Sequence, residues 1–112
     1  MHYDFILKET FMLTSKQRAY LRSLANNIDT ILIIGKSGIG ADTIKQADDA
    51  LTARELIKAK VLETSPIPVR EAAEKVSAET NSELVQVIGA KFVIYRKNDK
   101  EPKISLPKSS KK

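Results

Sequence analysis

The residues best suited to chemistry in this sequence form one short loop, Gly35-Lys36-Ser37-Gly38. An apolar run precedes the loop, and a helical pattern follows it. Glycine lacks Cβ, so the backbone can adopt positive φ and let a phosphate approach its N–H groups. The following helix points its free N–H groups and its positive dipole end at the same place, and Lys36 adds a mobile charge. This spacing indicates a loop that grips a nucleic-acid backbone, although glycines at a strand–helix junction equally serve turn geometry.

A basic helix is predicted just before the strand that leads into this loop. Thr14 and Gln17 have the spacing of a capping box, and apolar residues then recur at helical intervals as far as Ile28. The other faces of this helix, expected at residues 15–27, carry three basic residues, Lys16, Arg18 and Arg22. Because the helix feeds the strand that ends in the loop, we expect these three residues to lie beside the loop and share its phosphate contacts.

The composition excludes several kinds of chemistry. The chain has 112 residues, enough for one domain, with no cysteine and one histidine, His2. A disulfide scaffold, a zinc finger and histidine-based catalysis are therefore excluded. The loop lacks Walker spacing, and the adjacent Asp48 and Asp49 diverge by about 100° on a helix. We therefore expect no enzyme activity, no cofactor and no metal site. We also expect a cytoplasmic protein without membrane contact, since no apolar run approaches ~20 residues and no signal peptide is evident.

Charge is distributed unevenly along the chain. Seven basic and two acidic residues follow from Arg96 onward, and they account for the whole net charge of +5. Five glutamates against two basic residues lie at positions 63–83. A basic side and an acidic side suit the binding of a polyanion on one face. Tyr20 and Tyr95 are the only aromatic residues suited to stacking on bases inside the domain, so we expect recognition of RNA backbone and shape.

The hydrophobic periods predict one α/β domain. Strands are expected at 30–34, 56–62, 84–88 and 91–96, and helices at 15–27, 41–53 and 68–80. Gly89-Ala90 suits a type II′ hairpin turn. The order α-β-α-β-α-β-β predicts a two-layer domain, a mixed four-stranded sheet with helices packed on it. In the second strand Lys58 and Lys60 lie on the face away from Ile57, Ala59 and Val61.

The two ends of the chain are expected to differ from the domain at 12–96. Residues 1–11 show no clear period and precede a second methionine, so we interpret them as an upstream extension or an expression remnant. Residues 97–112 have the composition of a flexible basic tail. Ile104 and Leu106 leave open that part of the tail docks as an extended segment.

Four ordered blocks of this chain resemble the bacterial YhbY family, the stand-alone form of the CRM domain (chloroplast RNA splicing and ribosome maturation). The blocks are LTSKQR at 13–18, IGKSGI at 34–39, ALTARELIK at 50–58 and ELVQVIG at 83–89. The resemblance covers roughly residues 12–107, including Tyr95-Arg96 and Pro102-Lys103-Ile104. The family loop usually reads Gly-Lys-Gly-Gly. Here Ser37 takes the third place, where its hydroxyl can donate to a phosphate.

The resemblance implies a fold similar to the C-terminal domain of a translation initiation factor, with a GxxG loop likened to that of KH domains. It also implies binding to ribosomal RNA in precursors of the large ribosomal subunit. We therefore expect a ribosome assembly factor that contacts RNA through Gly35, Lys36, Ser37, Gly38, Lys16, Arg18 and Arg22. The alternative is a protein-interaction module whose acidic third helix docks a basic partner.

Overall fold

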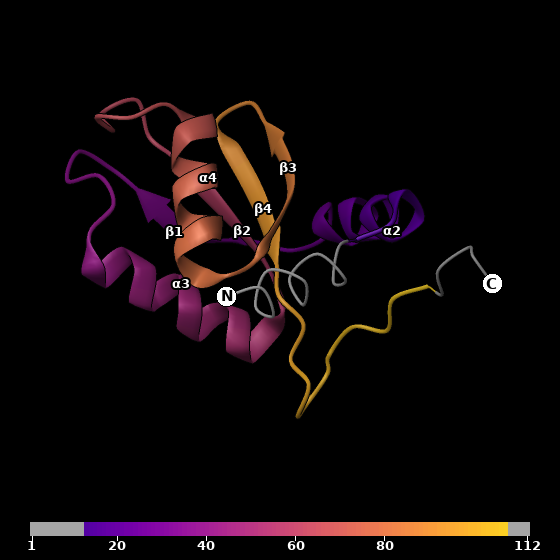
Figure 1. The fold of residues 1–112 in the computed structure, drawn as a ribbon. Coiled ribbons are helices and arrows are strands. Elements are labelled where there is room, and N and C mark those ends of the chain that lie inside the picture. Colours follow the sequence, from indigo (N-terminus) through magenta and orange to yellow (C-terminus); the bar gives the residue numbers. More distant parts are fainter. Residues whose placement is uncertain (1–12, 108–112) are drawn as a thin grey trace, which may run out of the picture.

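Seven helices and strands make up the part of the chain that the computed structural model describes, residues 13–107 (Figure 1). In chain order they are α2 (Ser15–Ala25), β1 (Thr30–Ile34), α3 (Ala41–Arg54), β2 (Leu56–Val61), α4 (Val69–Thr80), β3 (Glu83–Ile88) and β4 (Lys91–Tyr95). The predicted order is confirmed, and each boundary lies within two residues of its expected place. The interpretation of residues 1–11 and the last five residues of the expected tail lie outside the described residues.

The four strands form one mixed sheet in the order β1-β2-β4-β3. β1 and β2 are parallel and joined through α3, whereas β4 runs antiparallel to both of its neighbours, β2 and β3. Gly89 in the β3–β4 hairpin has φ of +59°, and Ala90 is not among the residues with positive φ. This pattern fits the type II′ turn expected at Gly89-Ala90.

Helices cover both faces of the sheet. α3 and α4 lie over one face, around a core that includes Ile57, Ala59 and Phe92. α2 lies over the opposite face, with Leu21 and Ala25 packed in a second core cluster. Alternation along each strand explains the division, because Leu56 and Val93 belong to the second cluster. The predicted two-layer arrangement did not specify that α2 lies on the opposite face of the sheet from α3 and α4.

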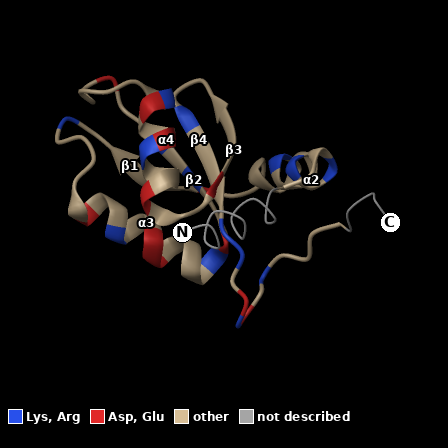
Figure 2. Cartoon of the chain, viewed as in Figure 1, with Lys and Arg blue, Asp and Glu red and all other residues tan. Residues whose placement is uncertain are grey.

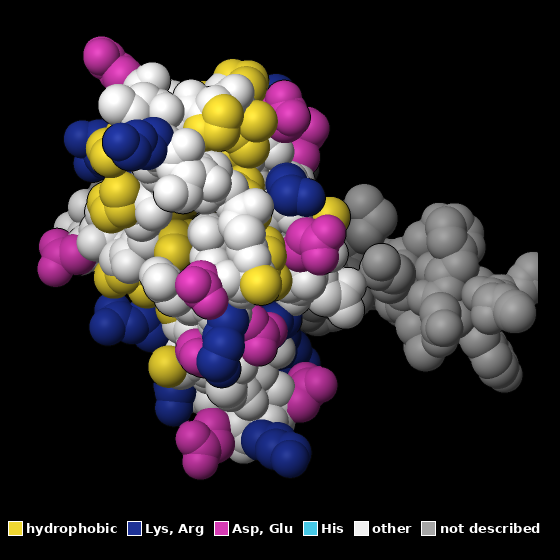
Figure 3. Space-filling model, turned by 90° about the vertical axis from the view of Figure 1, so that its left-hand side faces the viewer, with side chains coloured by type: hydrophobic (Ala, Val, Ile, Leu, Met, Phe, Trp, Pro, Cys, Tyr) yellow, Lys and Arg dark blue, Asp and Glu magenta, His cyan; other side chains and the backbone are white. Residues whose placement is uncertain are grey.

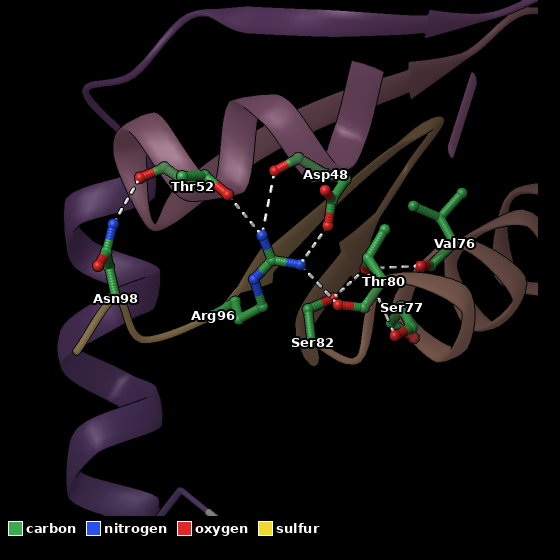
Figure 4. A network of polar contacts seen from close by, with 8 residues as sticks. All are labelled: Asp48, Thr52, Val76, Ser77, Thr80, Ser82, Arg96 and Asn98. Atoms are coloured by element: carbon green, nitrogen blue, oxygen red, sulfur yellow. Dashed lines mark hydrogen bonds and ion pairs between the residues drawn. The ribbon is translucent and has the colours of Figure 1, made fainter. Parts of the chain in front are cut away.

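A half-buried arginine, Arg96, joins α3, α4 and the end of β4 (Figure 4). Arg96 Nη1 donates to Asp48 Oδ1 at 2.7 Å and to the carbonyl oxygen of Thr80 at 2.8 Å. Its Nη2 donates to Thr52 Oγ1 at 2.9 Å and to the Asp48 carbonyl oxygen at 3.1 Å. The planar guanidinium suits this set of acceptors, because its donors point in fixed directions. The contact fixes the two helices to each other and to the sheet.

The chain beyond β4 is held by a buried carboxylate. Glu55 is fully buried, and its side-chain oxygens accept backbone N–H groups of Asn98 at 2.6 Å, Lys103 at 2.8 Å and Ile104 at 2.7 Å. Ile104 and Leu106 pack against the second core cluster. The described part of the tail therefore follows a path along the domain, held by these contacts. The alternative that Ile104 and Leu106 dock is the arrangement found.

Candidate nucleic-acid interface

The glycine loop is a tight turn at the carboxyl end of β1. The backbone N–H of Gly38 donates to the carbonyl oxygen of Gly35 at 2.9 Å, which closes the turn. Lys36 and Ser37 occupy its two exposed corners. Gly38 has φ of +71°, and a Cβ there would lie 3.1 Å from Cγ of Pro66. The turn therefore requires glycine at position 38, while Lys36 and Ser37 stay accessible to a ligand.

The loop leads directly into the amino-terminal end of α3. Gly40 is the N-cap and has no side chain, so it offers no cap to the first turn of the helix. Its own N–H donates to Thr43 Oγ1 at 3.2 Å. Asp42 is the acidic residue of this turn, where it complements the helix dipole. The positive end of α3 and Lys36 therefore lie at the same end of the molecule, as the phosphate hypothesis requires.

The expectation that Lys16, Arg18 and Arg22 lie beside the loop is wrong. Their helix, α2, ends before β1 begins, whereas the loop follows the last residue of β1. Five extended residues span about 16 Å, so the strand separates the two basic elements (Figure 1). Figure 2 shows Lys and Arg residues both on α2 and at the tip of the loop, at opposite sides of the view.

The three basic residues of α2 differ in their surroundings. Arg18 is half-buried, and its Nη1 donates to the carbonyl oxygen of Leu84 in β3. Lys16 and Arg22 are exposed. Within residues 13–107 neither of them forms an ion pair. Arg18 thus helps to hold α2 on the sheet, while Lys16 and Arg22 present free charges to a ligand.

The two tyrosines considered for base stacking differ in the exposure of their side chains. Tyr20 remains partly exposed on α2, whereas Tyr95 is 1% exposed and lies in the second core cluster. Burial raises the pKa of Tyr95 to about 12, with the Glu55 carboxylate and then Asp99 adding to the effect. Tyr95 therefore cannot stack on a base, and its role is in packing.

The predicted acidic surface on α4 is mixed in charge. Glu71, Glu74 and Glu79 are exposed, but so are Arg70 and Lys75, and Figure 2 shows both colours side by side on this helix. Arg70 Nη1 lies 3.9 Å from Glu74 Oε2 on the surface. Such a mixed helix face is typical of one that faces solvent.

Other features of the described residues add no further site of this kind. Within residues 13–107, no cluster of histidine, cysteine or carboxylate side chains could hold a metal ion. In the same part of the chain, no helix combines the length and apolar character that crossing a membrane would need. Sequence reasoning also left Lys60 and Lys91 out of the site, because nothing local in the sequence shows that their two strands pair.

Comparison with known proteins identifies the family of this chain. The CRS1 / YhbY (CRM) domain family matches residues 13–96. The chain belongs to this family. The CRM chain is 41% identical over 96 residues to the Bacillus subtilis protein named "Probable RNA-binding protein YqeI", a match that covers 86% of this chain and all of the relative. It is 31% identical to a Haemophilus influenzae protein named "RNA-binding protein", covering 86% of this chain and 96% of the relative.

The fold of the CRM chain also has a solved counterpart. The solution structure of the Staphylococcus aureus protein SAV1595, itself considered a candidate RNA-binding protein, superposes with a TM-score of 0.72 at 55% sequence identity. The match covers 86% of this chain and 100% of the other. The α/β fold and the family predicted from the sequence are thus both confirmed.

Proposed function

We propose that this CRM protein is a non-enzymatic RNA-binding protein of the cytoplasm that binds ribosomal RNA in precursors of the large subunit, as an assembly factor. The names of its relatives support RNA as the ligand. The ribosomal target rests on the resemblance to the YhbY family. The observation that carries the proposal is the tight turn closed at Gly38, which presents Lys36 and Ser37 next to an uncapped helix end.

The geometry supports phosphate binding at the loop. Positive φ at Gly38 lets the chain turn sharply, so a phosphate can reach the loop backbone and the first turn of α3 without meeting a side chain at position 40. Lys36 supplies a full charge, and the Ser37 hydroxyl supplies a donor. Lys16, Arg18 and Arg22 contribute charge farther away, at the other end of β1.

The direct test is RNA binding by the wild-type chain and a Lys36→Glu variant. Charge reversal removes one charge-assisted contact and adds repulsion, so we expect roughly a 30-fold loss of affinity for a ribosomal RNA fragment, about 2 kcal/mol. Lys100→Glu is the matched control, because Lys100 is also an exposed lysine and lies beside the carboxyl-terminal end of α3, away from the loop. If the folded Lys36→Glu variant binds RNA within threefold of wild type, the glycines serve only the turn.

The cellular part of the proposal needs a separate test. The protein should co-sediment with large-subunit precursors and be depleted from translating ribosomes. A gradient at low salt that keeps the protein wholly among free proteins would contradict the assembly role. RNA binding in vitro would remain a separate result.

A further inference from the structure

The face of the sheet opposite α3 and α4 is uncovered at the end that carries the glycine loop. The strand register places four residues in one row across this face, Ile33, Lys60, Lys91 and Ile88. Lys60 and Lys91 are exposed, and Ile33 and Ile88 are 54% and 60% exposed. The row therefore has two lysines at its centre and an exposed isoleucine on each edge strand.

α2 leaves this row open because it covers only the other end of the same face. Its core partners there are Leu56, Val85 and Val93. Lys58, two residues before Lys60 on the same face, is half-buried between the covered and the open parts. Figure 3 looks at the molecule from the β1 side, and Lys or Arg side chains adjoin hydrophobic ones at its upper left, at the end that carries the loops.

The two central lysines are placed where they repel each other. Lys60 and Lys91 are directly opposite on antiparallel strands, a position in which like charges are destabilising. Within residues 13–107 neither lysine forms an ion pair with a carboxylate. Two facing, unneutralised lysines fit a polyanionic ligand, because phosphates between them would remove the repulsion.

The row also lies between the two basic elements that β1 separates. Ile33 is next to the last residue of β1, so this row is the one nearest to Lys36. At the other end, α2 has two flanks. Gln17 Nε2 donates to the carbonyl oxygen of Pro107, so the flank with Gln17 faces the C-terminal segment. A turn of 100° per residue places Arg18 and Arg22 on the opposite flank, where Arg18 reaches the Leu84 carbonyl oxygen in β3, the strand that carries Ile88.

We propose that bound RNA crosses this open sheet face, with its backbone on Lys60 and Lys91, between the glycine loop and the Arg22 flank of α2. The proposal rests on the RNA-binding function above and adds the path of the ligand. The four residues of the row include no aromatic residue, so contacts to phosphate and sugar dominate over stacking on bases. Ile33 and Ile88 offer apolar contact at the edges.

A Lys60→Glu variant separates this proposal from simple loss of structure. The new carboxylate faces Lys91 and replaces a repulsive pair by an attractive one, so we expect the melting temperature to rise by ~1–4 °C. RNA affinity should fall about tenfold, with the salt slope lowered by about one contact. Lys91→Glu should behave in the same way. Lys100→Glu, beside the other end of α3, should leave RNA affinity unchanged.

The results of these experiments distinguish the proposed RNA path across the sheet from the proposed RNA-binding function. If Lys36→Glu weakens RNA binding and the folded Lys60→Glu variant binds like wild type, the path is overturned while the proposed function stands. If the wild-type chain shows no salt-sensitive RNA binding, the proposed function fails. If Lys60→Glu instead changes self-association of the RNA-free protein and leaves RNA affinity intact, the face belongs to a second copy and the proposal is overturned.

Discussion

The start of β2 and the end of β1 differ in where the negative charge that they can bind comes from. At the start of β2, the Glu55 carboxylate is fully buried and accepts three backbone N–H groups from one later segment of the chain. At the end of β1, the glycine loop exposes Lys36 beside an uncapped helix end. The chain thus fills the first site with its own anion and leaves the second open to solvent. The comparison separates a structural use of backbone donors from a use suited to a ligand.

The largest expected effect is on the filled site. Glu55→Ala removes the buried acceptor of three partly buried N–H groups, so we expect a loss of about 3 kcal/mol in the free energy of unfolding. Denaturant unfolding measures this loss. Glu63→Ala, at an exposed glutamate, is the matched control and should change stability by less than about 0.5 kcal/mol. An equal effect of both variants would remove the distinction between the two sites.

Tyr95, whose pKa is raised by burial and then by the Glu55 charge, reports on the same site through pH. The folded pKa of about 12 exceeds the ordinary value of 10.0, so folding favours the neutral phenol. This contribution is fully present below pH 10 and is lost as pH rises through 12. We expect about 2–3 kcal/mol of stability to disappear across that window. Unfolding curves at pH 9 to 12 measure it, and Tyr95→Phe should lack this part of the pH dependence.

At the open site, the effect on stability should come from the turn alone. Gly38→Ala combines a φ of +71° with a Cβ 3.1 Å from Pro66 Cγ, so we expect a loss of about 1–2 kcal/mol. Gly40→Ala is the matched control, since no atom lies within 4 Å of its Cβ and its φ is −120°. Thermal melts of both variants measure the two losses of stability. If Gly40→Ala is as damaging as Gly38→Ala, the turn does not depend on positive φ.

The smallest expected effect sharpens the functional half of the comparison. Lys36→Ala removes an exposed charge with no ion-pair partner within residues 13–107, so stability should stay the same. RNA affinity should fall about threefold to tenfold, and the salt slope should fall by about 0.7. Titrations at several salt concentrations measure both quantities. An unchanged salt slope would mean that Lys36 touches no phosphate.

Local patterns in the sequence were enough to predict the fold. The capping box is present as expected, with Thr14 Oγ1 accepting the Gln17 N–H and Gln17 Oε1 accepting the Thr14 N–H, both at 3.0 Å. Period changes along the chain located all of the described helices and strands. Each of these signals depends on residues within a few positions of one another. The helices and strands could therefore be predicted because their signals lie within short segments of the sequence.

The missed features all depend on residues far apart in the chain. Glu55 and Ile104 are 49 positions apart, and Arg96 lies 48 positions from Asp48. No local pattern shows that such residues meet. The misplacement of Lys16, Arg18 and Arg22 has the same cause. A helix of 11 residues is about as long as β1 and could fold back along it. Only the packing of α2 on the far end of the sheet, against Leu56 and Tyr95, separates it from the loop.

The position of β4 has a consequence for how the protein is made. β4 is the last strand in the described part of the chain, residues 13–107, yet it lies between β2 and β3 and pairs with both. A nascent chain that ends before Lys91 therefore presents two strands whose inner edges have no partner, and unpaired edges invite association with other chains. The sheet can close only after the whole domain has been synthesised. We therefore expect folding during translation to be delayed until the last strand emerges.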